Sequence, residues 1–347
     1  MKILATGTAG MLGSSLVPAM AAAGHEVVAT DINLTDRHPW GPAGPELGYL
    51  DVRDRHAIRD AFDAVRPDFV THLAAETSLQ FSDADPAHAY LTHATATKLI
   101  AQQCGRREIP IVYISTAGVF DGTKTGPYTE FDAPNPINTY GDSKWRGEQE
   151  VRQFAPCHYI VRAGWMVGGG AAKDHKFVSR IVDQLREGRT TLHAVGDKLG
   201  TPTYTADFAA CLLNLIDSEV YGLYHMACEG EGTRYDVAAE ILSVLGRDDI
   251  DLVEVTSEFF AEEFPSARPY SEIMVNQALD LQGMNLMRPW REALRHYLHH
   301  EFADLIIPAG EVPWTETYTR DATWAGAAKP YRFGLRHRFP KPIGLGA

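Results

Sequence analysis

Short apolar runs alternate with longer, mixed segments along the first 165 residues of the chain. The apolar runs, most of them rich in Val and Ile, are predicted to be buried strands at 2–6, 26–31, 69–75, 111–116 and 159–164. Segments between them, such as 11–24 and 94–105, have helical character and end at a glycine. This alternation predicts an α/β fold, a Rossmann-like doubly wound parallel sheet with helices on both faces.

The pattern loosens after residue 164. A strand is expected at 221–227, and helices are expected at 176–188, 204–218, 236–246 and 288–305. From about residue 306 the chain is rich in Pro, Gly and aromatic residues and shows little periodicity. Residues 329–347 contain no acidic residue but carry five basic ones, Lys329, Arg332, Arg336, Arg338 and Lys341.

Composition narrows the classes of function. The 347 residues carry a formal charge of −13, which argues against a nucleic-acid partner and against binding to an anionic membrane surface. No apolar run is long enough for a membrane span, and a strand starting at Lys2 leaves no room for a signal peptide. The four cysteines are scattered without paired spacing. We therefore expect reduced thiols and a cytoplasmic protein.

A glycine-rich loop follows the first predicted strand. "TGTAGMLG" places Gly7, Gly10 and Gly13 between that strand and the first helix. Glycine permits a tight turn and lets the backbone approach a pyrophosphate, which then lies at the helix N-terminus. The G-x-x-G-x-x-G spacing is one residue wider than the G-x-G-x-x-G fingerprint. In this position it predicts a dinucleotide-binding loop.

Two acids follow at strand ends. Asp31 ends the second strand, where a carboxylate accepts a hydrogen bond from the ribose 2′-OH and repels a 2′-phosphate. This favours NAD(H), although Arg37 is close enough in sequence to leave NADP(H) possible. The alternative is a solvated turn acid. Asp51 follows a third short strand, where it is expected near the adenine.

A phenol and an ammonium share one helix face in "TYGDSKWRGEQE". Tyr140 and Lys144 stand four residues apart, so they are neighbours on the helix surface. An adjacent ammonium favours the phenolate and lowers the pKa of a tyrosine toward working pH. Ser115 and Thr116 end a predicted strand, at the sheet edge where ligands bind. Thr116, Tyr140 and Lys144 are therefore expected to form an acid–base site.

These stretches together resemble the extended short-chain dehydrogenase/reductases, and within them the dTDP-4-dehydrorhamnose reductase family of NDP-4-keto-6-deoxysugar reductases. The resemblance covers roughly residues 1–300. It is carried by "TGTAGMLG", "HLAAETS", "STAGVFDGTKTGPYTE", "PNPINTYGDSKWRGE", "RAGWMVGG", "GTPTYTADFA" and the late "ARPYSEIMV" and "MRPWREAL".

The resemblance implies that hydride passes from NAD(P)H to the C4 carbonyl carbon of a nucleotide-linked sugar while Tyr140 supplies the proton. It implies a homodimer and a cleft between a dinucleotide-binding domain (1–164 plus about 202–228) and a substrate domain (165–201 plus 229–305), followed by an extension (306–347). Substrate contacts are expected at Thr116, Ala117, Trp165 and Arg268. Cofactor contacts are expected at Gly7, Gly10, Met11, Leu12, Asp31, Asp51, Val52, Leu73, Ala74, Ala75, Tyr140 and Lys144.

The chain also departs from the family pattern. The reductases usually carry Asp-Tyr after the catalytic threonine, where this chain has Ala117-Gly118. Leu79-Gln80 replaces an acidic pattern, and His93 stands where the superfamily commonly has asparagine. We expect the same chemistry on an altered sugar. Ala117-Gly118 also lacks the Asp-Glu of nucleotide-sugar 4,6-dehydratases, which argues against dehydration. A 4-epimerase and a non-catalytic regulatory subunit remain as alternatives.

Several weaker signals have two readings. Trp165 either contacts the sugar or packs in the core, and Arg268 either clamps a diphosphate or pairs with Glu262 or Glu263. The basic end of the chain either docks on the protein or is a surface or disordered end. The spacing of His296, His299 and His300 can hold a metal, but imidazoles near a helix C-terminus are favoured by the helix dipole without any metal. No metal site is expected.

Overall fold

The computed structural model describes residues 1–33 and 45–307, which lie within one compact unit, Met1–Pro308. Arg37 and the basic end of the chain lie outside the described residues. The proposed division into two domains and an extension stays a prediction. Among the helices of the described ranges, none has both the length and the apolar character that a membrane span requires.

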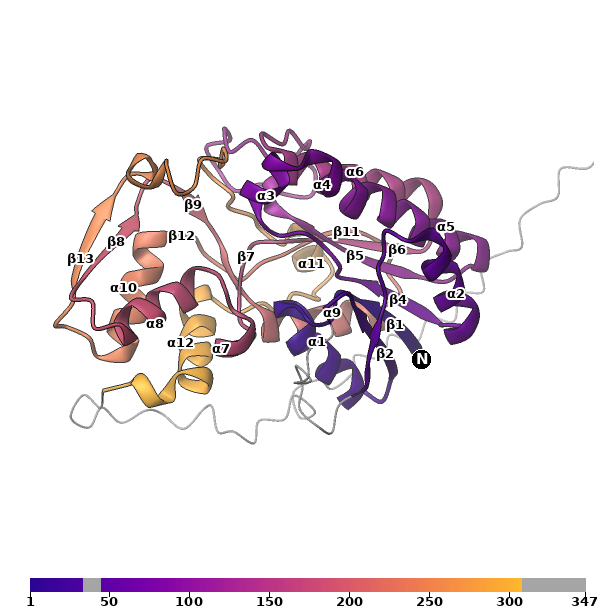
Figure 1. Cartoon of the computed structure of the whole chain (residues 1–347), viewed down its shortest axis with the longest axis horizontal. Helices are drawn as coiled ribbons and strands as arrows, with labels where there is room; N and C mark the ends of the chain where they lie inside the picture. The colour runs from indigo at the N-terminus through magenta and orange to yellow at the C-terminus, as the bar shows by residue number, and fades with distance from the viewer. Residues whose placement is uncertain (34–44, 308–347) are drawn as a thin grey trace, which may run out of the picture. The chain divides into compact units, whose positions relative to one another are not determined.

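The described residues contain a seven-stranded parallel sheet, which confirms the predicted Rossmann-like fold (Figure 1). Its spatial order is β11-β6-β5-β4-β1-β2-β3. The strands are β1 (Lys2–Thr6), β2 (Glu26–Asp31), β3 (Leu47–Tyr49), β4 (Phe69–His72), β5 (Ile111–Thr116), β6 (His158–Ala163) and β11 (Gly222–Met226). The order reverses direction between β1 and β4, and such a switch point is where parallel sheets bind ligands.

One predicted strand is shorter in the structure. β4 ends at His72, whereas the apolar run continues to residue 75. Leu73 still donates its N–H to the Thr6 carbonyl oxygen at 3.0 Å, and Ala74 then passes directly beside Gly7. The apolar character of 73–75 therefore reflects packing against the glycine loop.

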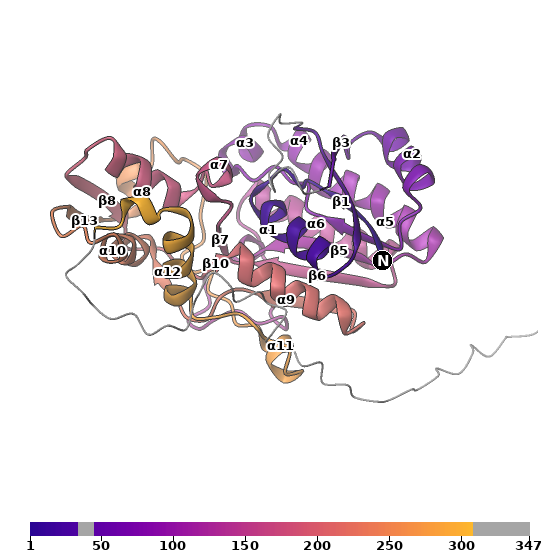
Figure 2. The same cartoon turned by 90° about the horizontal axis from the view of Figure 1, so that it is seen from below.

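Helices cover both faces of the sheet because successive strand residues point to opposite sides (Figure 2). Ile3 and Ala5 share a core with α1 and α9, while Leu4 belongs to a second core with α2, α5 and α6. These helices are α1 (Met11–Ala22), α2 (Arg55–Val65), α5 (Ala96–Arg107), α6 (Thr139–Phe154) and α9 (Thr205–Asp217). Short helices α3 (Leu79–Ala84) and α4 (Pro86–Tyr90) and a π-helical turn (Leu91–Thr95) precede α5.

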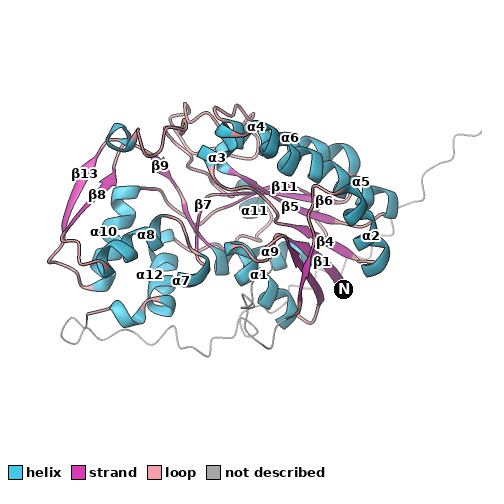
Figure 3. Cartoon of the chain, viewed as in Figure 1, coloured by secondary structure: helices cyan, strands magenta, loops and turns pink. Residues whose placement is uncertain are grey.

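The remaining elements build a second α/β layer beside the carboxyl edge of the sheet (Figure 3). Its parallel pair is β8 (Thr191–Val195) and β13 (Asp251–Val255), and short pairs join β7 (Trp165–Val167) to β10 (Pro202–Tyr204) and β9 (Leu199–Gly200) to β12 (Gly232–Thr233). Its helices are α7 (Gly170–Lys173), α8 (Phe177–Arg186), α10 (Arg234–Leu245) and α12 (Trp290–Glu301), with short 3₁₀ turns at Ser257–Phe260 and Ala303–Leu305. Helix α11 (Gln277–Leu281) instead packs against β11 of the large sheet, and a 3₁₀ turn at Ala117–Val119 follows β5. The core on the α1 and α9 side continues into α8, α10 and α12, so this layer is packed onto the sheet.

Candidate active site

The glycine loop is built for close approach. Gly7 has a φ of +71°, and a Cβ placed there would lie 2.3 Å from the Ala74 backbone nitrogen. Any larger residue would therefore be both strained and in collision. Leu73 and Ala74, two of the predicted cofactor contacts, accordingly lie directly against the loop. The loop thus brings backbone, without side chains, to the carboxyl end of β1.

This loop opens α1 in a manner that fits a dinucleotide pyrophosphate. Gly10 occupies the N-cap of α1, and within the described residues no side chain caps this helix end. The first-turn N–H groups of Met11 and Leu12 are thus left to bind an anion, which the helix dipole favours. Leu12 is buried and Met11 only partly so. The residues present therefore fit the pyrophosphate of a nicotinamide dinucleotide.

Asp31 is fixed by the backbone rather than solvated. Its side chain is buried, one carboxylate oxygen accepts the Ala9 N–H at 2.9 Å, and the other accepts the Asn33 N–H at 2.8 Å. Each oxygen keeps a second lone pair for a ligand hydroxyl. Asp51 instead forms a bidentate ion pair with Arg53 at 2.8 and 2.7 Å, and these hydrogen bonds lower the pKa of its carboxyl group. Val52, between them, is buried.

Tyr140 and Thr116 are brought together by the start of α6. The Asn138 side chain caps this helix by accepting the Gly141 N–H at 2.8 Å. A Cβ on Gly141 would lie 2.1 Å from the Gly118 carbonyl oxygen, so glycine allows α6 to press against the turn that follows β5. The Thr116 hydroxyl oxygen accepts the Gly118 N–H at 3.1 Å and is also hydrogen-bonded to the Tyr140 phenol.

Burial decides the protonation of the phenol. The pKa of Tyr140 is raised to about 12, mainly by burial, with the charges of Glu272 and Glu76 acting in the same direction and the hydrogen bond with Thr116 acting against them. The expected lowering by Lys144 is therefore not what this structure shows. The Lys144 ammonium nitrogen lies 4.2 Å from the centre of the Tyr113 ring, where it makes a cation–π contact. Tyr140 is consequently held as a proton donor.

Lys144 is itself strongly perturbed. Its side chain is 3% exposed, and burial lowers the pKa of its ammonium group to about 7, although the nearby Glu148 carboxylate acts in the opposite direction. The ammonium is thus poised to change charge near neutral pH, which is unusual for lysine and typical of functional sites.

We predict that this perturbation appears in the pH dependence of stability. Between the folded-state pKa of about 7 and the ordinary value of 10.5, the unfolded chain binds a proton that the folded chain does not. Stability must then rise with pH over this range. Urea unfolding of wild type and Lys144→Met at pH 6.5, 8 and 9.5 checks this. The free energy of unfolding of the wild type should increase relative to that of the variant as the pH rises. Identical pH dependence of the unfolding free energy in the wild type and the variant would contradict the prediction. Lys98→Met, at a partly exposed site, is the control.

A buried ion pair lies behind Lys144. Arg162 on β6 donates to both Glu148 carboxylate oxygens at 2.8 and 2.7 Å, and Ser115 donates to the same carboxylate at 2.6 Å. Both charged side chains are at most 2% exposed. Two sequence signals pointed here, since Glu148 stands four residues after Lys144 and Arg162 interrupts an apolar strand. The network joins β5, α6 and β6 beneath the site.

His93 supports the phenol from the other side. Its Nε2 accepts the Glu76 N–H at 3.0 Å, so in the neutral ring the proton is on Nδ1, which donates to the Ser143 hydroxyl at 2.8 Å. Burial keeps the ring neutral by lowering the pKa of His93 to about 2. The ring contacts Tyr140 edge-on, with centroids 5.6 Å apart. In the sequence, His93 stood out only because it replaces the asparagine that is common in the superfamily. Its contact with Tyr140 became evident only in the structure.

The substrate side is occupied by residues from the second layer. Trp165 donates its indole N–H to a Glu272 carboxylate oxygen at 2.7 Å, and the Arg234 guanidinium lies 3.8 Å from the centre of the Trp165 ring. Neither Arg234 nor Glu272 was singled out from the sequence. Trp165 thus packs against Arg234 and donates a hydrogen bond to Glu272, and its predicted contact with the sugar stays a prediction.

The other predicted substrate residues differ in their surroundings. Ala117 is 1% exposed in a small core with Phe120 and Tyr128, so its side chain offers no free surface to a sugar. Arg268 does not pair with the acids proposed for it: its guanidinium donates to the Phe264 and Ser266 carbonyl oxygens, and Glu263 pairs instead with Arg180 at 3.6 Å.

The histidines of α12 lie away from this site. The His296 and His300 rings stack with centroids 6.3 Å apart, and the Nδ1 of His300 lies 2.8 Å from a Glu301 carboxylate oxygen. In the part of the chain that the structure describes, no group of three or more His, Cys, Asp or Glu side chains is arranged to hold a metal ion.

Known proteins share this sequence and this fold. The profile of the family described as "RmlD substrate binding domain" matches residues 1–302. A dTDP-4-keto-6-deoxy-D-glucose reductase of Streptomyces niveus is 33% identical over 294 residues, which are 84% of this chain and 94% of that protein. The crystal structure of a dTDP-4-dehydrorhamnose reductase from Clostridium acetobutylicum matches with a TM-score of 0.77 and 33% identity, covering 86% of this chain and 99% of that one.

A second solved structure is that of a complex with a cofactor. It is a dTDP-4-dehydrorhamnose reductase from Bacillus anthracis in complex with NADP, and it matches with a TM-score of 0.76 and 28% identity over 86% of this chain and 99% of that one. The family profile spans most of the chain, and relatives above 30% identity are covered almost completely. The chain therefore belongs to the dTDP-4-dehydrorhamnose reductase family of extended short-chain dehydrogenase/reductases.

Proposed function

We propose that this protein reduces the C4 keto group of a nucleotide-linked 4-keto-6-deoxyhexose with NAD(P)H. The observation that carries the proposal is the convergence of Thr116, Tyr140 and Lys144 at the carboxyl edge of a sheet whose first strand ends in a glycine loop fit for a pyrophosphate. The related reductases of Streptomyces niveus and Clostridium acetobutylicum support the class of substrate.

The chain's residues divide the work. Thr116 accepts the Gly118 N–H, so its single hydroxyl proton is left to be donated to the sugar carbonyl oxygen when the substrate is bound. Tyr140, held protonated by burial, gives its proton to the oxygen as it becomes an alcohol. Lys144 holds the ribose hydroxyls of the cofactor through its ammonium group. When bound, the reduced nicotinamide supplies the hydride for the carbonyl carbon.

Consumption of reduced cofactor tests the proposal. Purified protein is given NADH or NADPH and a dTDP-linked 4-keto-6-deoxyhexose made in situ, and absorbance at the nicotinamide band is followed. Substrate-dependent loss of the reduced cofactor supports the reductase. If the protein binds cofactor but consumes none with several such sugars, the reductase assignment fails. Epimerisation without added cofactor, and a search for a stable hetero-complex, then test the two alternatives.

We also propose a preference for NAD(H), which rests on Asp31. Backbone N–H groups hold this carboxylate at the end of β2, so it cannot swing away from a ribose 2′-phosphate. Asp31→Asn, which keeps the size but removes the charge, is expected to lower the ratio of kcat/KM for NADH over NADPH by about tenfold. Steady-state kinetics with both cofactors measure it. An unchanged ratio, or a wild type that prefers NADPH, would overturn the preference.

A cytoplasmic homodimer is proposed as the working state. The proposal of a reducing compartment rests on the four cysteines Cys104, Cys157, Cys211 and Cys228, which lack paired spacing in the sequence. Sedimentation of the full-length protein decides the oligomeric state, and a monomer at micromolar concentration would exclude the dimer.

A further inference from the structure

The Glu272 carboxylate lies beside Gly118, in the Ala117-Gly118 pair that stands where related reductases usually carry Asp-Tyr. A Cβ placed on Gly118 would be 3.4 Å from the Thr116 hydroxyl oxygen and 3.6 Å from the Oε1 atom of Glu272. Glu272 comes from a segment more than 150 residues later, yet its carboxylate approaches the catalytic threonine. Its charge also contributes to the raised pKa of Tyr140. The space opened by Ala117-Gly118 is thus bordered by an acid from the second layer.

The carboxylate is held in a fixed direction. Its Oε2 accepts the Trp165 indole N–H at 2.7 Å. The Trp165 ring is in turn confined, because a Cβ on Gly200 would lie 2.2 Å from the ring and the Arg234 guanidinium lies 3.8 Å from its centre. Across the described ranges no hydrogen bond to Oε1 is found, so this atom keeps its full capacity to accept one.

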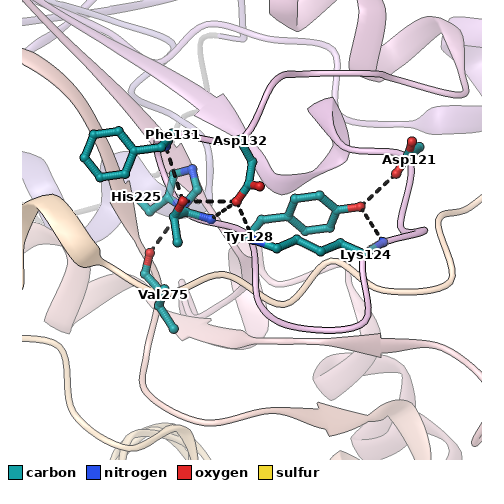
Figure 4. Close-up of polar contacts among 8 residues, drawn as sticks. Asp121, Lys124, Tyr128, Phe131, Asp132, His225 and Val275 are labelled. Carbon is teal, nitrogen blue, oxygen red and sulfur yellow. Dashed lines mark hydrogen bonds and ion pairs between the residues drawn. The ribbon is translucent and has the colours of Figure 1, made fainter.

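The backbone of this segment is equally constrained. The Glu272 N–H donates to the Leu199 carbonyl oxygen at 2.8 Å, and Tyr128 exchanges backbone hydrogen bonds with Ile273 and Val275 at 2.8 and 3.0 Å. Figure 4 shows how the neighbours are tied down, with the Tyr128 hydroxyl on Asp121 and the Val275 carbonyl oxygen beside the His225 ring. Such support on both flanks is what a recognition residue needs to present its side chain without reorganisation.

The surrounding charges determine what the carboxylate can bind. Burial raises the pKa of Glu272, while the indole hydrogen bond and the charges of Arg234, Arg268 and Lys198 lower it. With these cations around the carboxylate, an ammonium group on the ligand would be repelled. A neutral donor, a hydroxyl, meets no such penalty.

We propose that Glu272 is a substrate-recognition residue whose Oε1 accepts a hydrogen bond from the sugar's 3-hydroxyl. The Thr116 hydroxyl oxygen and Oε1 both lie within 3.6 Å of the position that a Gly118 Cβ would take, so the sugar oxygens that they hold are inferred to come from adjacent ring carbons. In a 4-keto-6-deoxyhexose, the carbons next to the carbonyl are C3, which bears a hydroxyl, and C5, which bears the methyl group. Glu272 then replaces, from another part of the chain, the wall that Asp-Tyr provides in related reductases. This inference rests on the proposed function.

Two substitutions and two substrates test it. Glu272→Ala is expected to lower kcat/KM for the 3-hydroxy substrate by about 10- to 100-fold, as for loss of a charged hydrogen bond, and to change it less than about threefold for the 3-deoxy analogue. Trp165→Phe, which keeps the ring but removes the N–H, should raise KM with a smaller effect on kcat. Glu258→Gln, at an exposed site on the same layer, is the matched control and should leave kcat/KM unchanged for both substrates.

Binding measurements separate this inference from the proposed function. By calorimetry, Glu272→Ala should bind dTDP alone as wild type does but lose affinity for a dTDP-linked 6-deoxyhexose bearing a 3-hydroxyl. Weaker binding of dTDP itself would mean a general structural role and would overturn the inference. Equal losses with and without the 3-hydroxyl would overturn it as well. If the wild type turns over no keto sugar, the reductase assignment fails, and the binding comparison still decides the role of Glu272.

Discussion

Replacing Tyr140 with phenylalanine should lower kcat by about 10²- to 10⁴-fold while leaving cofactor affinity within a few-fold of wild type. The substitution removes the proton donor but keeps the ring that packs edge-on against His93 at 5.6 Å. Because burial raises the pKa of Tyr140 to about 12, the phenol is protonated over the whole working range and acts as the acid. Single-turnover measurement of the reduced nicotinamide, with tryptophan fluorescence titration of the cofactor, separates chemistry from binding.

Tyr90 offers a matched control on the same region of the molecule. Its hydroxyl donates to an Asp142 carboxylate oxygen at 2.6 Å, and this bond raises the pKa of Tyr90 to about 12, close to that of Tyr140. Tyr90→Phe deletes an equivalent group from an exposed position and should keep kcat unchanged. If Tyr140→Phe retained more than about a tenth of wild-type kcat, a different acid would have to protonate the sugar oxygen.

Breaking the Glu148–Arg162 pair should be the most destabilising single change at the site, at about 3–5 kcal/mol of unfolding free energy. Arg162→Met leaves the Glu148 carboxylate buried with only the Ser115 hydroxyl as a partner in the described network. An uncompensated buried charge costs far more than the pair contributes. Urea unfolding followed by circular dichroism measures the loss as a shift of the midpoint.

The double variant Glu148→Leu, Arg162→Met decides the cause. Removing both charges should restore much of the stability, because the penalty comes from the orphaned ion and not from lost packing. Glu26→Gln breaks the exposed Lys2–Glu26 contact of 2.9 Å and should cost less than about 1 kcal/mol. A double variant no more stable than Arg162→Met would show that shape, rather than charge, holds β5, α6 and β6 together.

Local pattern was sufficient for most of the sheet and for placing Tyr140 and Lys144 on one helix. β1, β2 and β5 match the predicted strands residue for residue, because the interiors of these buried parallel strands are continuous apolar runs. The spacing of Tyr140 and Lys144 placed them on one helix face without knowledge of the rest of the fold. The glycine at position 7 likewise predicted a close approach of the backbone, and the structure shows why, since any side chain there would collide with Ala74.

What the sequence by itself determined is therefore whatever depends on near neighbours: most strands and helices, the glycine loop, and the placement of Tyr140 and Lys144 one turn apart on the same helix. Tertiary structure alone decided the rest. Glu272 and Trp165 meet across more than 100 residues, and the pKa values of Tyr140 and Lys144 are governed by burial in place of the ion pairing that the spacing suggested. The physical reason is that desolvation and long-range contact depend on what the folded chain packs around a group, which no local pattern records.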